Sequence, residues 1–136
     1  MAEKNPQQEL FGRLLVMLRD EFGKDMVFDG FLPPDGTPYP FVYLAGSHQV
    51  DDMSNKMQTL GTIYQTVDVW MDDPHKRGTL SACIERCIDV ARKLSRTINY
   101  SWMLSGCDHQ IIQDNTTKTP LLHGIITLEF KLLGGN

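Results

Sequence analysis

The sequence has few of the features that mark an enzyme, a secreted protein or a membrane protein. It contains 3 cysteines, an odd number that does not make a disulfide framework. No stretch approaches the roughly 20 apolar residues of a membrane span, and Met1 to Pro6 lack the apolar segment of a secretory signal. A Gly-x-Ser-x-Gly elbow, a Gly-rich phosphate loop followed by a lysine and a Cys-x-x-Cys pair are all missing. These absences predict a soluble cytoplasmic protein with no catalytic activity and no cofactor.

Basic residues are too few and too scattered for a nucleic-acid-binding face. The sequence has 13 basic and 17 acidic residues, a net charge of −4, and no run of Lys or Arg beside an aromatic stripe. A length of 136 residues, of which 41% are hydrophobic, suits one domain. We expect residues 1–136 to form that domain, with a structured core from Gln7 to Leu133.

The residues that bind metals elsewhere do not have metal-site spacing here. Cys83 and Cys87 lie one helical turn apart in an apolar stripe, which is typical of buried core cysteines. Asp72 and Asp73 are better explained as helix-capping residues than as cation ligands. The four histidines are scattered along the chain: His48, His75, His109 and His123. The sequence predicts no metal site.

The best-defined segment is a strand that leads into a helix. Residues 62–71 are rich in β-branched and aromatic side chains, and Pro74 ends that pattern. Beyond it, apolar residues recur at steps of three and four, which predicts one buried helical stripe. The stripe comprises Leu80, Cys83, Ile84, Cys87, Ile88, Ala91, Leu94 and Ile98.

The rest of the chain predicts one more helix and three more strands. Leucines four residues apart predict a helix from Gln7 to Phe22, and four prolines between Phe31 and Pro40 predict an extended loop with a turn at Asp35–Gly36. We expect further strands at Phe41–Gly46, at His109–Gln113, with an ambiguous approach from Asn99 to Asp108, and at Leu122–Leu133. The predicted fold is α+β, in the order α-β-β-α-β-β. A single mostly antiparallel, mixed sheet carries both helices on one face.

A polar segment between two predicted strands is longer than a tight turn requires. It runs from Ser47 to Gly61 and contains Asp51, Asp52, Asn55 and Lys56. We interpret it either as a long hairpin tip or as a flexible loop. Because loops of this length often have a function, these four residues are candidates for an assembly contact or for the wall of a ring lumen.

Aromatic residues on one sheet face are the second candidate surface. By strand alternation, Tyr64, Asp68 and Trp70 lie opposite the apolar residues of the same strand. Tyr and Trp are enriched at the centres of subunit interfaces, so this face is a candidate interface. The alternative is that both faces of the sheet are covered within one chain.

Three features together resemble a known family. They are the Pro-rich approach to the strand Tyr39–Leu44, the strand ending in Val67–Trp70 with its Asp-rich step into a helix, and the Ile- and Leu-rich last strand. This order resembles the small tail-completion proteins of long-tailed bacteriophages and prophages, both tail terminators and tail-to-head joining proteins.

The resemblance implies a structural role in a virion. It implies a homo-oligomeric ring, commonly a hexamer, at the head-proximal end of the tail. The ring would be assembled in the bacterial cytoplasm and would contact the tail tube and the head connector. DNA would pass through as cargo, with no membrane involved.

Two other classes of function remain open from the residues alone. One is a small-molecule-binding or enzymatic α+β domain with a pocket between helices and sheet. The other is an adaptor that binds a peptide along an exposed sheet edge.

Overall fold

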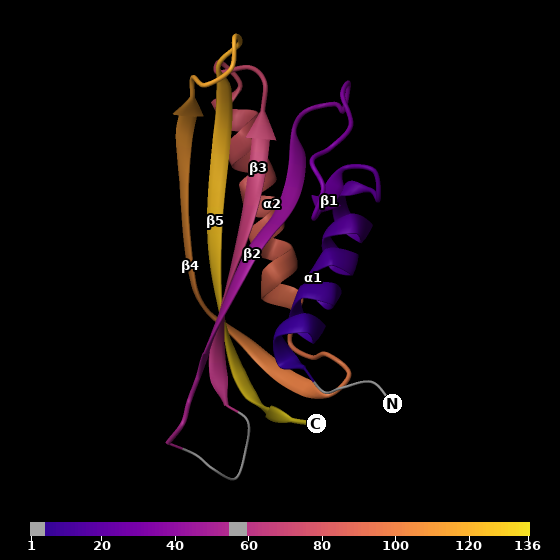
Figure 1. Cartoon of the computed structure of the whole chain (residues 1–136), viewed down its shortest axis with the longest axis vertical. Helices are drawn as coiled ribbons and strands as arrows, with labels where there is room; N and C mark the ends of the chain where they lie inside the picture. Colours follow the sequence, from indigo (N-terminus) through magenta and orange to yellow (C-terminus); the bar gives the residue numbers. More distant parts are fainter. Residues whose placement is uncertain (1–4, 55–59) are drawn as a thin grey trace.

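A computed structural model describes residues 5–54 and 60–136 of the chain. In this described part, two helices and five strands form an α+β fold with one mixed sheet, which confirms the predicted class (Figure 1). The elements are α1 (Pro6–Phe22), β1 (Val27–Asp29), β2 (Phe41–Asp51), β3 (Gly61–Met71), α2 (Arg77–Lys93), β4 (Tyr100–Asp114) and β5 (Leu121–Gly135). The strand order is β1-β2-β3-β5-β4. The β1–β2 pair is parallel and the other pairs are antiparallel.

Helix α1 begins and ends with the local signals that the sequence contains. The Asn5 side chain accepts a hydrogen bond from the Gln8 backbone N–H at 3.0 Å, and Pro6 follows at the first helical position. At the other end, Gly23 has a φ of 99°, and its N–H bonds the Arg19 carbonyl at 2.8 Å. The predicted helix is confirmed to within one residue.

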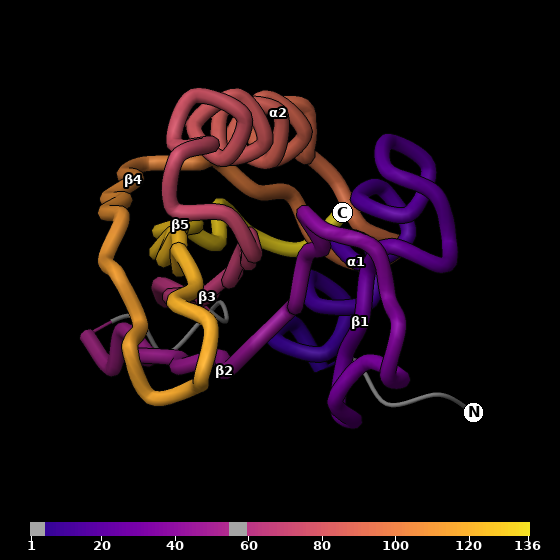
Figure 2. Tube along the Cα trace, turned by 90° about the horizontal axis from the view of Figure 1, so that it is seen from above, coloured from indigo at the N-terminus to yellow at the C-terminus, as the bar shows by residue number. Residues whose placement is uncertain are grey.

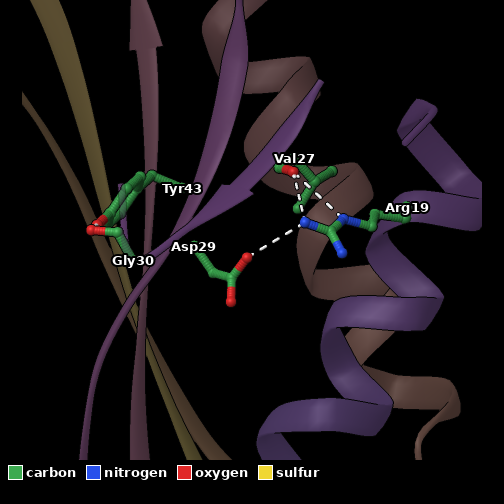
Figure 3. Close-up of polar contacts among 5 residues, drawn as sticks. All are labelled: Arg19, Val27, Asp29, Gly30 and Tyr43. Atoms are coloured by element: carbon green, nitrogen blue, oxygen red, sulfur yellow. Dashed lines mark hydrogen bonds and ion pairs between the residues drawn. The ribbon is translucent and has the colours of Figure 1, made fainter. Parts of the chain in front are cut away.

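Strand β1 adds one element to the predicted order. It has three residues, too few for a period-two pattern to be recognised. Its position is held from helix α1, because the Arg19 guanidinium donates to the Val27 carbonyl at 3.3 Å and to the Asp29 carboxylate at 3.2 Å (Figure 3). Nearby, the Tyr43 hydroxyl donates to the Gly30 carbonyl at 3.0 Å and holds the start of the Pro-rich loop against β2.

Helix α2 corrects two of the sequence expectations. Its N-cap is Lys76, which makes no side-chain capping bond, whereas the Asp73 carboxylate accepts from the His75 N–H at 2.9 Å. Asp73 therefore closes the turn before the helix, and neither Asp72 nor Asp73 caps it. The helix ends at Lys93, so the stripe is buried from Leu80 to Leu94, whereas Ile98 is 89% exposed.

The hairpin strands β2 and β3 are paired almost to their tip. Strand β2 continues five residues beyond its predicted end at Gly46, and the ladder with β3 runs to the pair Asp51–Gly61. The described part of the polar segment therefore belongs to a long hairpin, with Ser47 to Asp51 in β2 and Gly61 at the start of β3. The register shifts between Leu44 and Ser47, where β2 has a bulge.

Gln65 fills the position beside this bulge. Its side chain is fully buried, and its amide N–H groups donate to the carbonyls of Ala45 (3.0 Å), Gly46 (3.2 Å) and Thr66 (3.0 Å). A bulge leaves backbone groups outside the ladder, and buried groups of this kind need partners. The buried glutamine supplies them.

Both helices pack on one face of the sheet, and Figure 2 shows α2 along one side of the strands. Alternate residues of β3 and β5 point to the helices and form the core with the leucines of α1. Helix α2 lies close to β5 at Gly124, where an added Cβ would be 2.8 Å from the Ile84 Cδ1. The two helices are also joined by Arg86, which pairs with Glu21 at 3.0 Å and lies over the Phe22 ring.

Candidate assembly surfaces

The sheet face opposite the helices, called the open face below, has no helix over it in the described part of the chain. Strand β3 alternates between buried residues on the helix side and half-buried residues on the open face. Tyr64, Asp68 and Trp70 all lie on the open face, as their spacing predicts. In residues 5–54 and 60–136, the Pro-rich loop lies beside one end of this face, and the open-face side chains of β3 are half-buried.

Asp68 and Trp70 belong to one cluster with His123 of β5. The His123 Nε2 lies 2.9 Å from the Asp68 Oδ1, and the His123 and Trp70 rings stack at 3.8 Å with an interplanar angle of 9°. The side chains of His123 and Asp68 are only 16% and 18% exposed. The Trp70 ring is thus fixed in orientation, which lowers the conformational entropy that it would lose in a contact.

Tyr64 belongs to a second polar cluster that crosses three strands. It lies directly opposite Glu129 of β5, and the hydrogen bond to the Glu129 carboxylate raises the pKa of Tyr64. From β4, the Ser105 hydroxyl donates to the same carboxylate at 2.9 Å and to the Glu129 backbone carbonyl at 3.2 Å. The clusters make the open face polar at its surface and ordered in its side chains.

Sequence reasoning missed His123 and Ser105 as parts of this face, and it assigned Glu129 to the polar side of the last strand without naming it as a site residue. A signal was present for His123 and Glu129, because alternation along the last strand puts them opposite Leu122 and Leu128. The partner of each residue depends on the register between β3 and β5, which alternation does not determine. Ser105 was not recognisable, because a register shift interrupts β4 between Leu104 and Gly106.

A groove of about 800 Å³ continues the open face between the Pro-rich loop and the β4–β5 hairpin. Its described lining includes four aromatic residues, Tyr39, Phe41, Tyr43 and Trp70. Three carboxylates, Asp35, Asp68 and Asp114, also line it, with no lysine or arginine among these lining residues. We call this hollow the aromatic groove.

Two further predicted site residues, Asp51 and Asp52, lie at the other end of the molecule. Asp51 ends β2, and the Asp52 carboxylate accepts hydrogen bonds from the backbone and hydroxyl of Ser54, which lower the pKa of Asp52. Asp68 lies seven positions along β3 from the Asp51–Gly61 pair, or roughly 23 Å of strand. The structure therefore does not bring all the predicted residues together. Asn55 and Lys56 lie outside the described residues.

Other kinds of site receive no support from the described residues. Among them, no group of three or more His, Cys, Asp or Glu side chains is placed to hold a metal ion. A hydrogen bond between the two buried thiols of α2 lowers the pKa of Cys83 and raises that of Cys87, whereas Cys107 is exposed. Neither helix in the described part is long and apolar enough to cross a membrane.

Comparisons with known proteins find a likeness in structure and none in sequence. No protein-family model matches the chain, and no curated protein matches it. A chain of the virion of a native gene transfer agent particle is similar in structure, with a TM-score of 0.63 and 15% sequence identity. The likeness covers 98% of this chain and 100% of that chain. At this identity the comparison shows a shared fold over the whole length of both chains.

Proposed function

We propose that this protein is a structural subunit of a phage or prophage virion. The observation that carries the proposal is the end-to-end likeness to a chain of a gene transfer agent virion. The likeness covers 98% of this chain and 100% of that chain, so it extends over the whole fold and is not limited to one motif. A fold can host many functions, so the surfaces of this chain must support the same conclusion.

The finer proposal is a ring-forming tail-completion subunit, either a tail terminator or a tail-to-head joining protein. The sequence resembles that family, and the open face offers a surface for assembly. Strands β2, β3, β5 and β4, taken over the 11-residue length of β3, span about 36 Å by about 19 Å, which is an area of roughly 700 Å². This is close to the about 800 Å² that each partner buries in a standard interface.

The proposed ring has six copies at the head-proximal end of the tail, between the tail tube and the head connector. DNA passes through as cargo, and the net charge of −4 suits a lumen that must not hold phosphates. Assembly takes place in the cytoplasm of the bacterial host. The role is structural, with no catalysis and no cofactor.

The test is the mass of the purified protein in solution, followed by electron microscopy. We expect a discrete ring of several copies. A monomer at every concentration, with a melting temperature that rises on addition of a small molecule, would instead favour a ligand-binding domain.

A hairpin variant tests where such a ring joins its neighbours. Replacing residues 52–60 with Asn-Gly keeps the ladder up to the Asp51–Gly61 pair and makes a two-residue turn. We expect the fold to be unchanged and the joining of heads and tails to be impaired, as counted by electron microscopy of particles. A normal yield of joined particles would show that this tip makes no necessary contact.

A peptide-binding adaptor is a second candidate, favoured by the edge strand β4. This strand has 15 residues, pairs with β5 on one side and has neither proline nor lysine to block a new strand on the other. Replacing the exposed Gln110 with proline would remove an edge donor or distort the edge. Loss of peptide capture with the ring intact would support the adaptor.

A further inference from the structure

The turn between α2 and β4 displays one apolar side chain on a rigid support. Ile98 is 89% exposed. The backbone on either side of it is held, because the Thr97 N–H bonds the Tyr100 carbonyl at 2.9 Å and the Trp102 N–H bonds the Ser95 carbonyl at 2.8 Å. We call residues 95–100 the Ile98 turn.

Side chains from distant parts of the chain fix the same turn. The Glu9 carboxylate of α1 accepts from the backbone and side chain of Asn99, at 3.0 and 2.6 Å, and the Trp102 indole donates to the Thr97 hydroxyl at 3.0 Å. Single exposed apolar residues are common on protein surfaces. This one is unusual because its backbone is already ordered, so a contact there has little backbone entropy to lose.

The charges of the Ile98 turn and of the aromatic groove are opposite. Arg96 is exposed and makes no ion pair within the part of the chain that the structure describes. The aromatic groove is lined by three carboxylates and four aromatic rings. Hydrogen bonds from Thr116 lower the pKa of Asp114, so this carboxylate is charged at neutral pH. An isoleucine beside an arginine matches such a groove in both polarity and charge.

One copy cannot fill its own groove with its own turn. The Ile98 turn precedes β4, whereas Asp114 ends it, so roughly 45 Å of strand separates them. Figure 1 shows the two ends of β4 at opposite ends of the molecule. Two different surfaces at opposite ends make a head-to-tail contact, which closes into a ring when the rotation between copies allows it.

We infer that the aromatic groove of one copy binds the Ile98 turn of a second copy. The inference rests on the proposed ring and names the contact that closes it. Ile98 lies against the aromatic rings, and Arg96 pairs with Asp35 or Asp114.

The experiment uses one variant of the turn and two variants of the groove. The turn variant is Ile98→Ser with Arg96→Ala, which adds no charge that an altered groove could pair with, and the first groove variant is Asp114→Arg. A second groove variant, Asp35→Arg, changes an exposed side chain for which no hydrogen bond is found among the described residues. The control is Val16→Asp, which places a carboxylate at an exposed position of α1 that belongs to neither surface. Melting temperatures close to wild type confirm that each variant is folded.

The measurement is the mass of each protein in solution, alone and in mixture. We expect each surface variant alone to be a monomer, with self-association weakened at least roughly a hundredfold, and Val16→Asp to assemble normally. Mixing the turn variant with a groove variant restores one intact contact and should give a one-to-one dimer that grows no further.

The outcomes separate this inference from the proposed function. Surface variants that assemble like wild type, or a mixture that stays monomeric, would overturn the inference and leave the ring in place. A wild-type protein that stays monomeric at every concentration would overturn both.

Discussion

The two faces of the central strand β3 differ in what stabilises them. On the helix side, Ile63, Val67 and Val69 are at most 1% exposed and lie in a continuous apolar core. On the open face, Tyr64, Asp68 and Trp70 are half-buried and are held by polar and ring contacts with β5. Burial of apolar area stabilises the first face, whereas the second is held by a few half-buried polar pairs and one ring stack, each of which contributes about 1 kcal/mol. Along this one strand, the helix-side residues therefore stabilise the fold, whereas the alternate residues on the open face are available for the proposed contacts.

The largest expected effect is on the helix side. Replacing Ile88, which is 3% exposed, with Asp should lower the free energy of unfolding by about 4 kcal/mol, because the carboxylate has no partner in the core. Ser81→Asp puts the same group on an exposed position of the same helix and should change the stability by less than about 0.5 kcal/mol. Urea unfolding of both variants checks the contrast. Equal stabilities would show that the stripe of α2 is not in the core.

A smaller loss is expected where α2 meets β5. Gly124→Val should cost roughly 2 kcal/mol, because the new side chain overlaps the end of Ile84. Adding Ile84→Ala makes room, so the double variant should be more stable than the sum of the two single changes predicts. Thermal and urea unfolding of the four proteins give the coupling energy. If the effects of the two substitutions on the free energy of unfolding were additive, Ile84 would not be in close contact with Gly124.

Gln65→Leu tests the bulge of β2 and should cost about 2 kcal/mol, because buried backbone carbonyls lose their donors. Gln113→Leu makes the same change at an exposed position of β4 and serves as the control. Unfolding in urea measures both. If the two variants were equally stable, the carbonyls at the bulge would have other partners.

The smallest effect on stability is expected on the open face. Thr127→Arg places a long cation at its centre and should change the free energy of unfolding by less than about 1 kcal/mol. In the proposed ring it should nevertheless prevent assembly, because a buried unpaired charge is costly at an interface. Val16→Arg is the control for added charge. Intact rings from Thr127→Arg would exclude the centre of the open face from the contact.

Much of the fold could be predicted because the apolar patterns are strong and local. The stripe of α2, the leucines of α1 and the alternation in β3 and β5 each determine a face without knowledge of the neighbours. β1 could not be predicted, since three residues show no period and the strand depends on Arg19. Ile98 continued the helical spacing by coincidence, because the helix had already ended at Lys93.

For the candidate surfaces, the sequence predicted which residues of β3 lie on the open face, but it did not predict which side chains they contact. Tyr64, Asp68 and Trp70 were assigned to the correct face by alternation alone. Their contacts with Glu129 and His123 depend on a pairing across more than fifty residues, which no local pattern contains. The aromatic groove was not foreseen, because its lining comes from the Pro-rich loop, strands β2 and β3 and the β4–β5 hairpin.

The position of β5 has a consequence for the order in which a new chain matures. This strand follows every other element in the sequence, yet it lies between β3 and β4 in the sheet. During synthesis on the ribosome, β3 and β4 are made before the strand that joins them, so each waits with an unpaired edge. A nascent or truncated chain without β5 therefore lacks the complete open face, and its unpaired strand edges favour aggregation. In the proposed virion, a subunit would therefore become competent to assemble only after β5 has been added to the sheet.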